Sequence, residues 1–118
     1  MMAMRDRLDS TGHSFQAYFK RATSPLVVLR LLMEKPMYGY ELTQEMKQRS
    51  GGAFTISVLY PVLYRLEDAG LLTSEVLAPP GGRAKKYYRI TDAGRRTLAQ
   101  MQQFWQEYKH CIDDIMEV

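Results

Sequence analysis

The sequence predicts a mainly α-helical fold with one small β hairpin, and three observations support this prediction. Apolar residues recur at helical spacing in several segments between residues 14 and 69. Two short segments rich in strand-forming residues lie on either side of a Pro-Pro-Gly-Gly cluster at 79–82, which is typical of a hairpin turn. Residues 92–118 carry apolar side chains three and four positions apart, the pattern of one long helix.

The composition is that of an ordinary globular protein with one domain. Of the 118 residues, 46% are hydrophobic and 25% are charged, which excludes a disordered chain. The single cysteine, Cys111, excludes an internal disulfide and favours a reduced intracellular setting. The longest apolar run, Leu26 to Met33, contains Arg30 and is far shorter than the ~20 residues of a membrane span. Residues 1–10 are too charged for a secretory signal, so we expect a cytoplasmic protein without membrane contact.

The predicted organisation has three parts. Residues 1–23 form an N-terminal extension with a short helix at 14–22, residues 24–91 form the central domain, and residues 92–118 form a C-terminal helix. Ser24 is predicted to cap a helix that starts at Pro25 and runs to Glu34. That helix is apolar on nearly all sides, so we expect a partner subunit to help cover it.

The order of the remaining elements is that of a winged helix-turn-helix domain. Helices are predicted from Tyr38 to Arg49 and from Ser57 to Ala69, and strands over 71–77 and 84–91. Thr91 and Asp92 begin the last helix. In such a fold the third helix enters the DNA major groove and the hairpin, or wing, lies beside it.

The third helix carries groups that suit DNA contact on its predicted outer face, namely Ser57, Tyr60, Pro61, Tyr64 and Arg65. Their hydroxyl, phenol and guanidinium groups can contact phosphates or bases. The alternative is that the two tyrosines pack against neighbouring elements.

A basic segment covers the hairpin tip, the second strand and the start of the last helix. It has one acid, Asp92, and six basic residues: Arg83, Lys85, Lys86, Arg89, Arg95 and Arg96. This local charge predicts a polyanionic partner, with a solvated surface as the alternative. Side chains alternate faces along a strand, so we expect Tyr88 and Ile90 to turn toward the core.

The last helix has an apolar seam, formed by Leu98, Met101, Trp105, Tyr108, Ile112 and Ile115. Their spacing is that of the a and d positions of a coiled coil. The alternative is an amphipathic helix packed on its own domain. Dimerisation is the preferred interpretation, because the winged helix ends before this helix and leaves little of the chain to cover it.

Enzymatic and metal-binding patterns are weak. Gly-rich phosphate loops and hydrolase motifs are absent from the sequence. His110 and Cys111 are adjacent on a helix and therefore point about 100° apart, which excludes a nucleophile–base pair. Glu107, His110 and Asp114 share a helix face, but a solvated face is the favoured interpretation. We therefore expect no catalytic, metal or cofactor site.

Three segments resemble the PadR family of bacterial transcriptional regulators: PMYGYELTQEM at 36–46, SVLYPVLYRLEDAGLL at 57–72 and GGRAKKYYRITDAGRRTL at 82–98. The resemblance covers about residues 24–117, and three motifs in this order are highly specific. The chain is most similar to the small members, whose dimerisation module is a single C-terminal helix.

The resemblance implies a homodimeric repressor that binds a pseudo-palindromic operator in double-stranded DNA and is relieved by a small molecule. The last helix would pack against the partner's first helix, which includes Leu29. The matching motif positions imply close packing at Gly39. The residues that the resemblance places near DNA are Tyr38, Tyr40, Tyr60, Tyr64, Lys85 and Lys86.

The resemblance also implies an effector site at the dimer centre. Some small members bind flat aromatic compounds there through an aromatic residue of the last helix, and Trp105 falls in the matching stretch, with Met101 and Tyr108 nearby. These side chains can alternatively fill the interface by themselves. The chain departs from the family at Pro79-Pro80, where the wing turn is usually more polar. A protein-interaction or small-molecule-binding module that does not bind DNA remains the alternative function.

Overall fold

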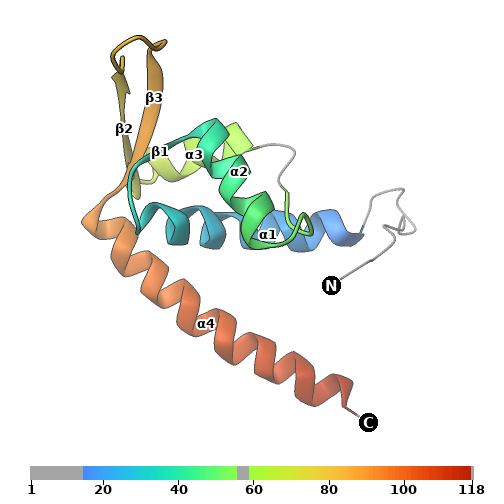
Figure 1. Ribbon diagram of the computed structural model, residues 1–118. Coiled ribbons are helices and arrows are strands. Elements are labelled where there is room, and N and C mark those ends of the chain that lie inside the picture. The colour runs from blue at the N-terminus through green and yellow to red at the C-terminus, as the bar shows by residue number, and fades with distance from the viewer. Residues whose placement is uncertain (1–14, 56–58, 118) are drawn as a thin grey trace.

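The computed structural model describes residues 15–55 and 59–117 and has a helical head, a projecting β wing and a long final helix (Figure 1). The elements are α1 (Phe15–Leu32), β1 (Met37–Tyr38), α2 (Gly39–Arg49), α3 (Leu59–Asp68), β2 (Leu72–Leu77), β3 (Lys85–Ile90) and α4 (Asp92–Met116). This arrangement confirms the predicted mainly α fold with a small hairpin. The predicted N-terminal extension before residue 15, the start of the third helix at Ser57 and the last residue lie outside the described residues.

The hydrophobic core lies where α1, α2 and α3 meet the base of the sheet. Its buried members are Val28, Leu29, Leu31, Leu32, Met37, Leu42, Met46, Leu59, Val62, Leu63, Leu66, Leu72, Tyr88, Ile90 and Leu98. Each helix contributes residues at three- and four-residue spacing, as an amphipathic helix must when one side faces a core. Tyr88 and Ile90 do turn inward, which confirms the predicted alternation along β3.

The wing is part of a three-stranded antiparallel sheet with the order β1-β3-β2. Leu72 pairs with Ile90 at its base and Leu77 with Lys85 near its tip. In the turn, Gly81 has a φ of 73°, and the Gly82 N–H donates to the Pro79 carbonyl at 3.0 Å. The sequence analysis missed β1, because a strand of two residues is too short to carry an alternating pattern.

The predicted helix break at Ser24 and Pro25 is wrong. The helix α1 is continuous, and Pro25 lies inside it. The Thr23 hydroxyl donates to the Phe19 carbonyl at 2.8 Å, and the Ser24 hydroxyl donates to the Lys20 carbonyl. These two hydroxyls add bonds to carbonyls of the turn before the proline, and α1 also packs against α4 and the head.

The continuous helix also corrects the expected role of Leu29. This side chain is 0% exposed within a single chain, and its neighbours Val28, Leu31 and Leu32 are buried as well. These four side chains are therefore covered within their own chain, where α1 packs against α2, α3, β3 and α4, and they need no partner subunit. Leu29 has no surface that a second copy could contact.

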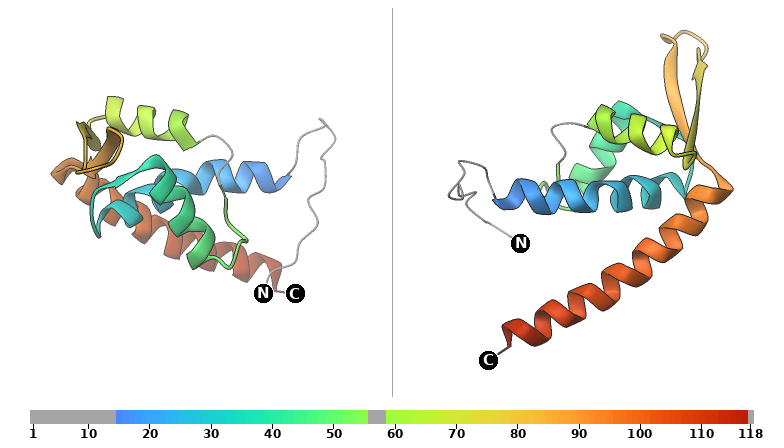
Figure 2. Two further views of the ribbon diagram at one scale, coloured as in Figure 1. Left: turned by 45° about the horizontal axis from the view of Figure 1, so that its top comes forward. Right: turned by 180° about the vertical axis from the view of Figure 1, so that it is seen from behind.

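The helix α4 begins at a capped end and then leaves the head. The Thr91 hydroxyl accepts the Gly94 N–H at 3.0 Å and donates to the Gly70 carbonyl at 2.7 Å, as the sequence predicted for the cap. Its 25 residues span about 38 Å. Figure 2 shows α4 diverging from α1, so that the two helices form a V below the head. None of the helices in the described residues is both long and apolar enough to cross a membrane.

Candidate nucleic-acid interface and apolar groove

The outer face of α3 carries the residues that the spacing predicted there. Tyr60 and Tyr64 are 50% and 49% exposed, and Arg65 is exposed beside them. The two phenol rings lie 6.1 Å apart. The buried stripe of α3 holds this face outward, because its leucines and valine fill the core. Ser57, the fourth predicted contact, lies outside the described residues.

Gly39 brings the start of α2 against α3. A Cβ atom at this position would lie 2.7 Å from Cζ of Tyr60, and it would overlap the phenol oxygen as well. The close packing that the resemblance implied at Gly39 is therefore present, and it also limits how Tyr60 can move. Tyr40, one residue further along α2, is exposed.

Lys85 packs on one face of the wing, toward β1. Its Nζ atom lies 4.3 Å from the centre of the Tyr38 ring and donates to the Tyr38 hydroxyl at 3.3 Å. The Tyr38 and Tyr87 rings meet edge to face at 5.3 Å. Arg83, near the tip, is exposed and makes no ion pair within the described part of the chain. Glu75 pairs with Tyr87 and so lies on this same side of the wing, but no ion pair joins it to Arg83 or Lys85.

Lys86 packs on the opposite face, toward α3. Its Nζ atom lies 3.8 Å from Oε1 of Glu67, and the Ser74 hydroxyl donates to the other Glu67 oxygen at 2.6 Å. The Tyr88 phenol and the Glu67 carboxylate hold the pKa of Lys86 above its ordinary value. Sequence reasoning missed Glu67 and Ser74, because nothing in the local pattern relates them to a lysine on another element.

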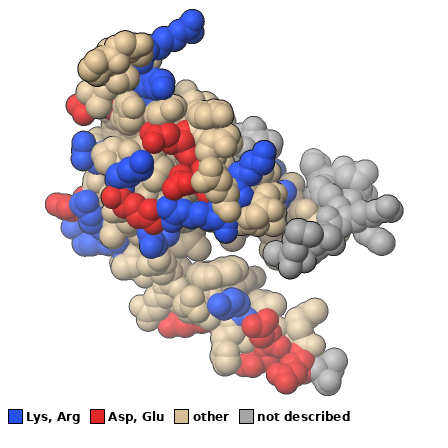
Figure 3. Space-filling view, viewed as in Figure 1, with Lys and Arg blue, Asp and Glu red and all other residues tan. Residues whose placement is uncertain are grey.

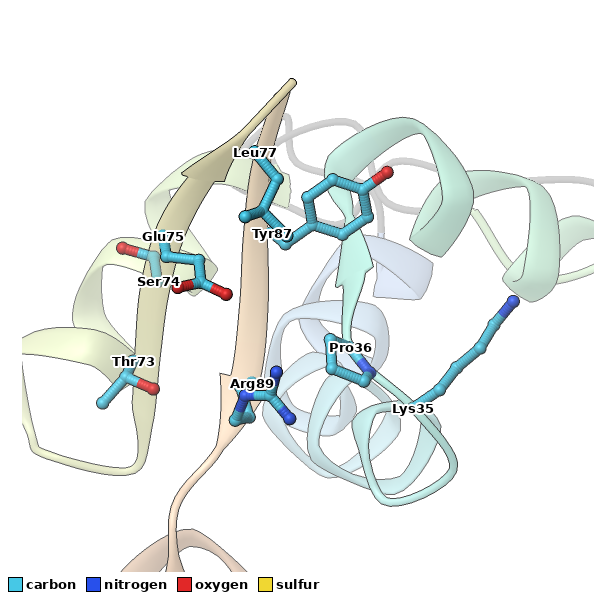
Figure 4. Close-up of a pocket in the computed structure, with 8 residues that line it drawn as sticks. All are labelled: Lys35, Pro36, Thr73, Ser74, Glu75, Leu77, Tyr87 and Arg89. Carbon is cyan, nitrogen blue, oxygen red and sulfur yellow. The ribbon is translucent and has the colours of Figure 1, made fainter. Parts of the chain in front are cut away.

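The remaining basic residues are spread over different surroundings. Arg95 pairs with Asp92 at 3.1 Å in the first turn of α4. Arg89 lines an open hollow of about 400 Å³ at the base of the wing, together with Lys35, Glu75 and Tyr87 (Figure 4). Figure 3 shows Lys and Arg on the wing and across the head, with Asp and Glu between them on the head and also at the far end of α4. Two residues of the predicted basic segment thus have acidic partners, Lys86 in Glu67 and Arg95 in Asp92.

A second, larger hollow lies inside the V between α1 and α4. This groove has a volume of about 770 Å³. Its lining is mostly apolar and consists of Tyr18, Phe19, Ala22, Thr23, Pro25, Leu26, Gln100, Met101, Phe104, Trp105, Tyr108, Lys109, Ile112 and Asp113. Trp105 is 38% exposed, and the rings of Phe104 and Tyr108 stack at 5.4 Å. The sequence analysis missed the contribution of α1, because it ended that helix before Pro25.

The residues of the predicted apolar seam of α4 lie in three different environments. Leu98 is buried in the core of its own chain and is not available to a partner. Met101, Trp105, Tyr108 and Ile112 line the groove. Ile115 lies beyond the groove and is exposed.

The polar face of α4 holds the weak metal candidate of the sequence analysis. His110 Nε2 lies 3.6 Å from an Asp114 oxygen, and both side chains are largely exposed. No three His, Cys, Asp or Glu side chains among residues 15–55 and 59–117 come together in a way that could hold a metal ion. Cys111 is exposed on the same helix.

Comparison with known proteins gives consistent similarities. The chain matches the transcriptional regulator PadR-like family over residues 28–100. A transcriptional regulator of Mycobacterium tuberculosis is 42% identical over 82 residues, which cover 70% of this chain and 75% of that protein. The negative transcriptional regulator PadR of Bacillus subtilis is 32% identical over 73 residues, covering 60% of this chain and 40% of that protein. The crystal structure of a PadR family transcriptional regulator from Eggerthella lenta aligns with a TM-score of 0.73 and 35% identity, over 86% of this chain and 84% of that one.

Proposed function

The chain belongs to the PadR-like family of transcriptional regulators, and from this premise we propose that it is a homodimeric repressor of a pseudo-palindromic DNA operator, relieved by a planar aromatic effector. The family and the named relatives are transcriptional regulators, which confirms the expectation of a regulator and not an enzyme. Repression is supported by the name of the Bacillus subtilis relative, a negative regulator.

The observation that carries DNA binding is the exposed outer face of α3 next to the wing. Both elements lie at the end of the molecule away from α4 (Figures 1 and 2). We propose that Tyr60, Tyr64 and Arg65 contact base edges and phosphates in the major groove. Arg83 and Lys85 of the wing supply charge for the neighbouring phosphates. Tyr38 and Tyr40 lie at the start of α2, where we propose that they contact the sugar–phosphate backbone.

A gel-shift assay at several salt concentrations tests this division of roles. Replacing Arg83 and Lys85 with Ala together removes two phosphate contacts, and the slope of log affinity against log salt should fall by about 1.8 on each bound subunit. Tyr60→Ala should instead leave this slope unchanged and reduce the ratio of operator to random-DNA affinity by about tenfold or more. If the wild-type chain binds no DNA at any salt concentration, it is a protein-interaction or small-molecule-binding module instead.

We propose that a second copy of the chain fills the groove between α1 and α4. The walls expose large apolar side chains, and Phe19 alone is 70% exposed. Soluble monomers rarely leave such a contiguous apolar surface open to water. The charged residues that line the groove, Lys109 and Asp113, both belong to α4, and the α1 wall carries none. A twofold pair would therefore bring the apolar walls of two copies together.

The effector is proposed to bind next to Trp105, between the two copies. A flat aromatic ring could stack on the indole, and Met101 is flexible enough to adapt to different ligands. Titration with planar dyes should quench the emission of this tryptophan, the only one in the chain, at micromolar concentration. Operator affinity should fall in parallel. If the dyes neither quench the Trp105 emission nor release the operator, the groove is an interface filled by the second copy, without an effector site.

A further inference from the structure

We propose that Lys86 is a positioning residue, which fixes the wing against the recognition helix α3 and does not contact DNA phosphate. This inference rests on the proposed DNA-binding function and assigns different roles to two adjacent lysines. Lys85 and Lys86 are consecutive on β3, so their side chains leave the strand on opposite faces. One faces β1, and the other faces α3.

The contacts of Lys86 connect the wing to α3 at two points. Its ammonium lies 3.8 Å from the Glu67 carboxylate and 5.5 Å from the centre of the Tyr64 ring, and both partners belong to α3. On its own strand it lies 5.4 Å from the centre of the Tyr88 ring. Since Tyr64 is one of the proposed base-contacting residues, this lysine lies beside the recognition surface.

Glu67 is itself held in place. The Ser74 hydroxyl of β2 donates to its second oxygen at 2.6 Å, so the carboxylate bridges one residue from each strand of the wing. Ser74 and Lys86 both lie on the face of the hairpin that is turned to α3, since Ser74 pairs with Tyr88. A single carboxylate of α3 thus contacts both strands. We call this cluster of Glu67, Ser74 and Lys86 the brace.

Lys85 and Lys86 differ more in the charge of their partners than in the exposure of their side chains. The positive charge of Lys86 is compensated by Glu67, whereas among the described residues Lys85 has only the neutral Tyr38 hydroxyl and ring as partners. A phosphate would have to compete with Glu67 for Lys86, and the uncompensated carboxylate would then repel the DNA. The Tyr88 ring lies on the same side, with its centre 5.4 Å from the Lys86 ammonium, and adds a further contact that holds the lysine near α3.

The two possible roles of Lys86 predict opposite effects of Glu67→Gln on operator affinity. If Lys86 holds the wing against α3, both Lys86→Met and Glu67→Gln remove the same contact between the wing and α3. Each should then lower operator affinity by about three- to tenfold, and the double variant should be no worse than either single variant. The salt slope should stay at its wild-type value. Arg83→Met is the matched control, because it removes an exposed wing cation without an acid partner and should lower the slope by about 0.9 per subunit.

If Lys86 contacts phosphate instead, Lys86→Met lowers the salt slope as Arg83→Met does. Glu67→Gln then raises operator affinity, because it frees the lysine and removes a negative charge near DNA. Either result overturns the proposal. Lys86→Arg should retain operator affinity under the brace, since a guanidinium can bridge the same carboxylate.

Amide hydrogen exchange without DNA tests the brace independently of DNA binding. The amides of β2 should exchange faster in Lys86→Met and in Glu67→Gln than in the wild type or in Arg83→Met. Unchanged exchange in β2 would overturn the brace. If β2 exchanges faster in both variants but the wild type binds no DNA, the proposed DNA-binding function is wrong and the brace is still supported.

Discussion

At the scale of single residues, Glu34 has the densest set of ionic contacts in the head. Arg49 of α2 donates to both of its carboxylate oxygens, at 2.7 and 2.5 Å, and Arg30 of α1 reaches it at 3.2 Å. These hydrogen bonds and charges lower the pKa of Glu34 to about 2 from its ordinary 4.5. Glu34 follows the end of α1, and Arg49 is the last residue of α2, so this cluster ties the two helix ends together.

Stability should depend on the charge of Glu34 in acid. In the unfolded chain this carboxyl takes up a proton near pH 4.5, whereas in the folded chain it stays charged until the pH approaches 2. Its stabilising contribution is therefore complete above about pH 4.5 and is lost as the pH falls to about 2. The melting temperature of Glu34→Gln should lie below that of the wild type at pH 6 and converge with it toward pH 2. Glu75→Gln, an exposed control, should show no such convergence, and a gap that stays constant with pH would contradict the assignment.

At the scale of elements, the joint between α4 and the head depends on a close backbone approach at Gly94. A Cβ atom there would lie 2.7 Å from Cγ1 of Ile90 and would overlap the carbonyl oxygen of Leu71. This carbonyl, just before β2, accepts the Thr91 N–H at 3.1 Å and cannot turn aside as a flexible side chain can. The first turn of α4 therefore packs at its closest distance to the sheet, and this sets the direction in which the helix leaves.

Two effects oppose each other in Gly94→Ala. Helix propensity favours Ala over Gly by about 1 kcal/mol, whereas overpacking a tight contact costs about 1–3 kcal/mol. The overlap involves backbone, so we expect packing to dominate, with a net loss of up to about 2 kcal/mol in the free energy of unfolding. Urea denaturation measures this loss. Gln106→Ala, on the exposed part of the same helix, should be neutral or slightly stabilising, and a stabilised Gly94→Ala would show that the joint tolerates the methyl group.

The same scale shows which parts of the fold a sequence can predict. The helices α3 and α4 and the hairpin follow from periodicity and caps, so their bounds agree with the sequence to within about two residues where the structure describes them. The unbroken α1 does not follow, because Ser24-Pro25 is locally a helix start signal, whereas the contacts of α1 with the distant α4 are not visible in the local pattern. The partners of Lys86 and the α1 wall of the groove depend likewise on contacts between distant segments.

At the scale of the whole molecule, the groove between α1 and α4 dominates the exposed apolar surface. Ile112→Asp would place a charge in its wall, at the centre of the proposed contact between two copies. We expect this variant to sediment as a monomer, whereas the wild type sediments as a dimer. Cys111→Asp is the matched control, because it introduces the same charge at the adjacent exposed position outside the groove lining. An unchanged dimer in Ile112→Asp would exclude the groove as the interface.

Because α1 continues through Pro25, a single helix connects the groove with the core. Its 18 residues form one rod of about 27 Å, with one arm in the groove and the other in the core beneath α3. Phe19 and Leu29 are thus ten residues apart on one continuous helix, with no loop between them. We therefore expect a displacement of α1 at the groove to be transmitted to the part of the helix that lies beneath α3.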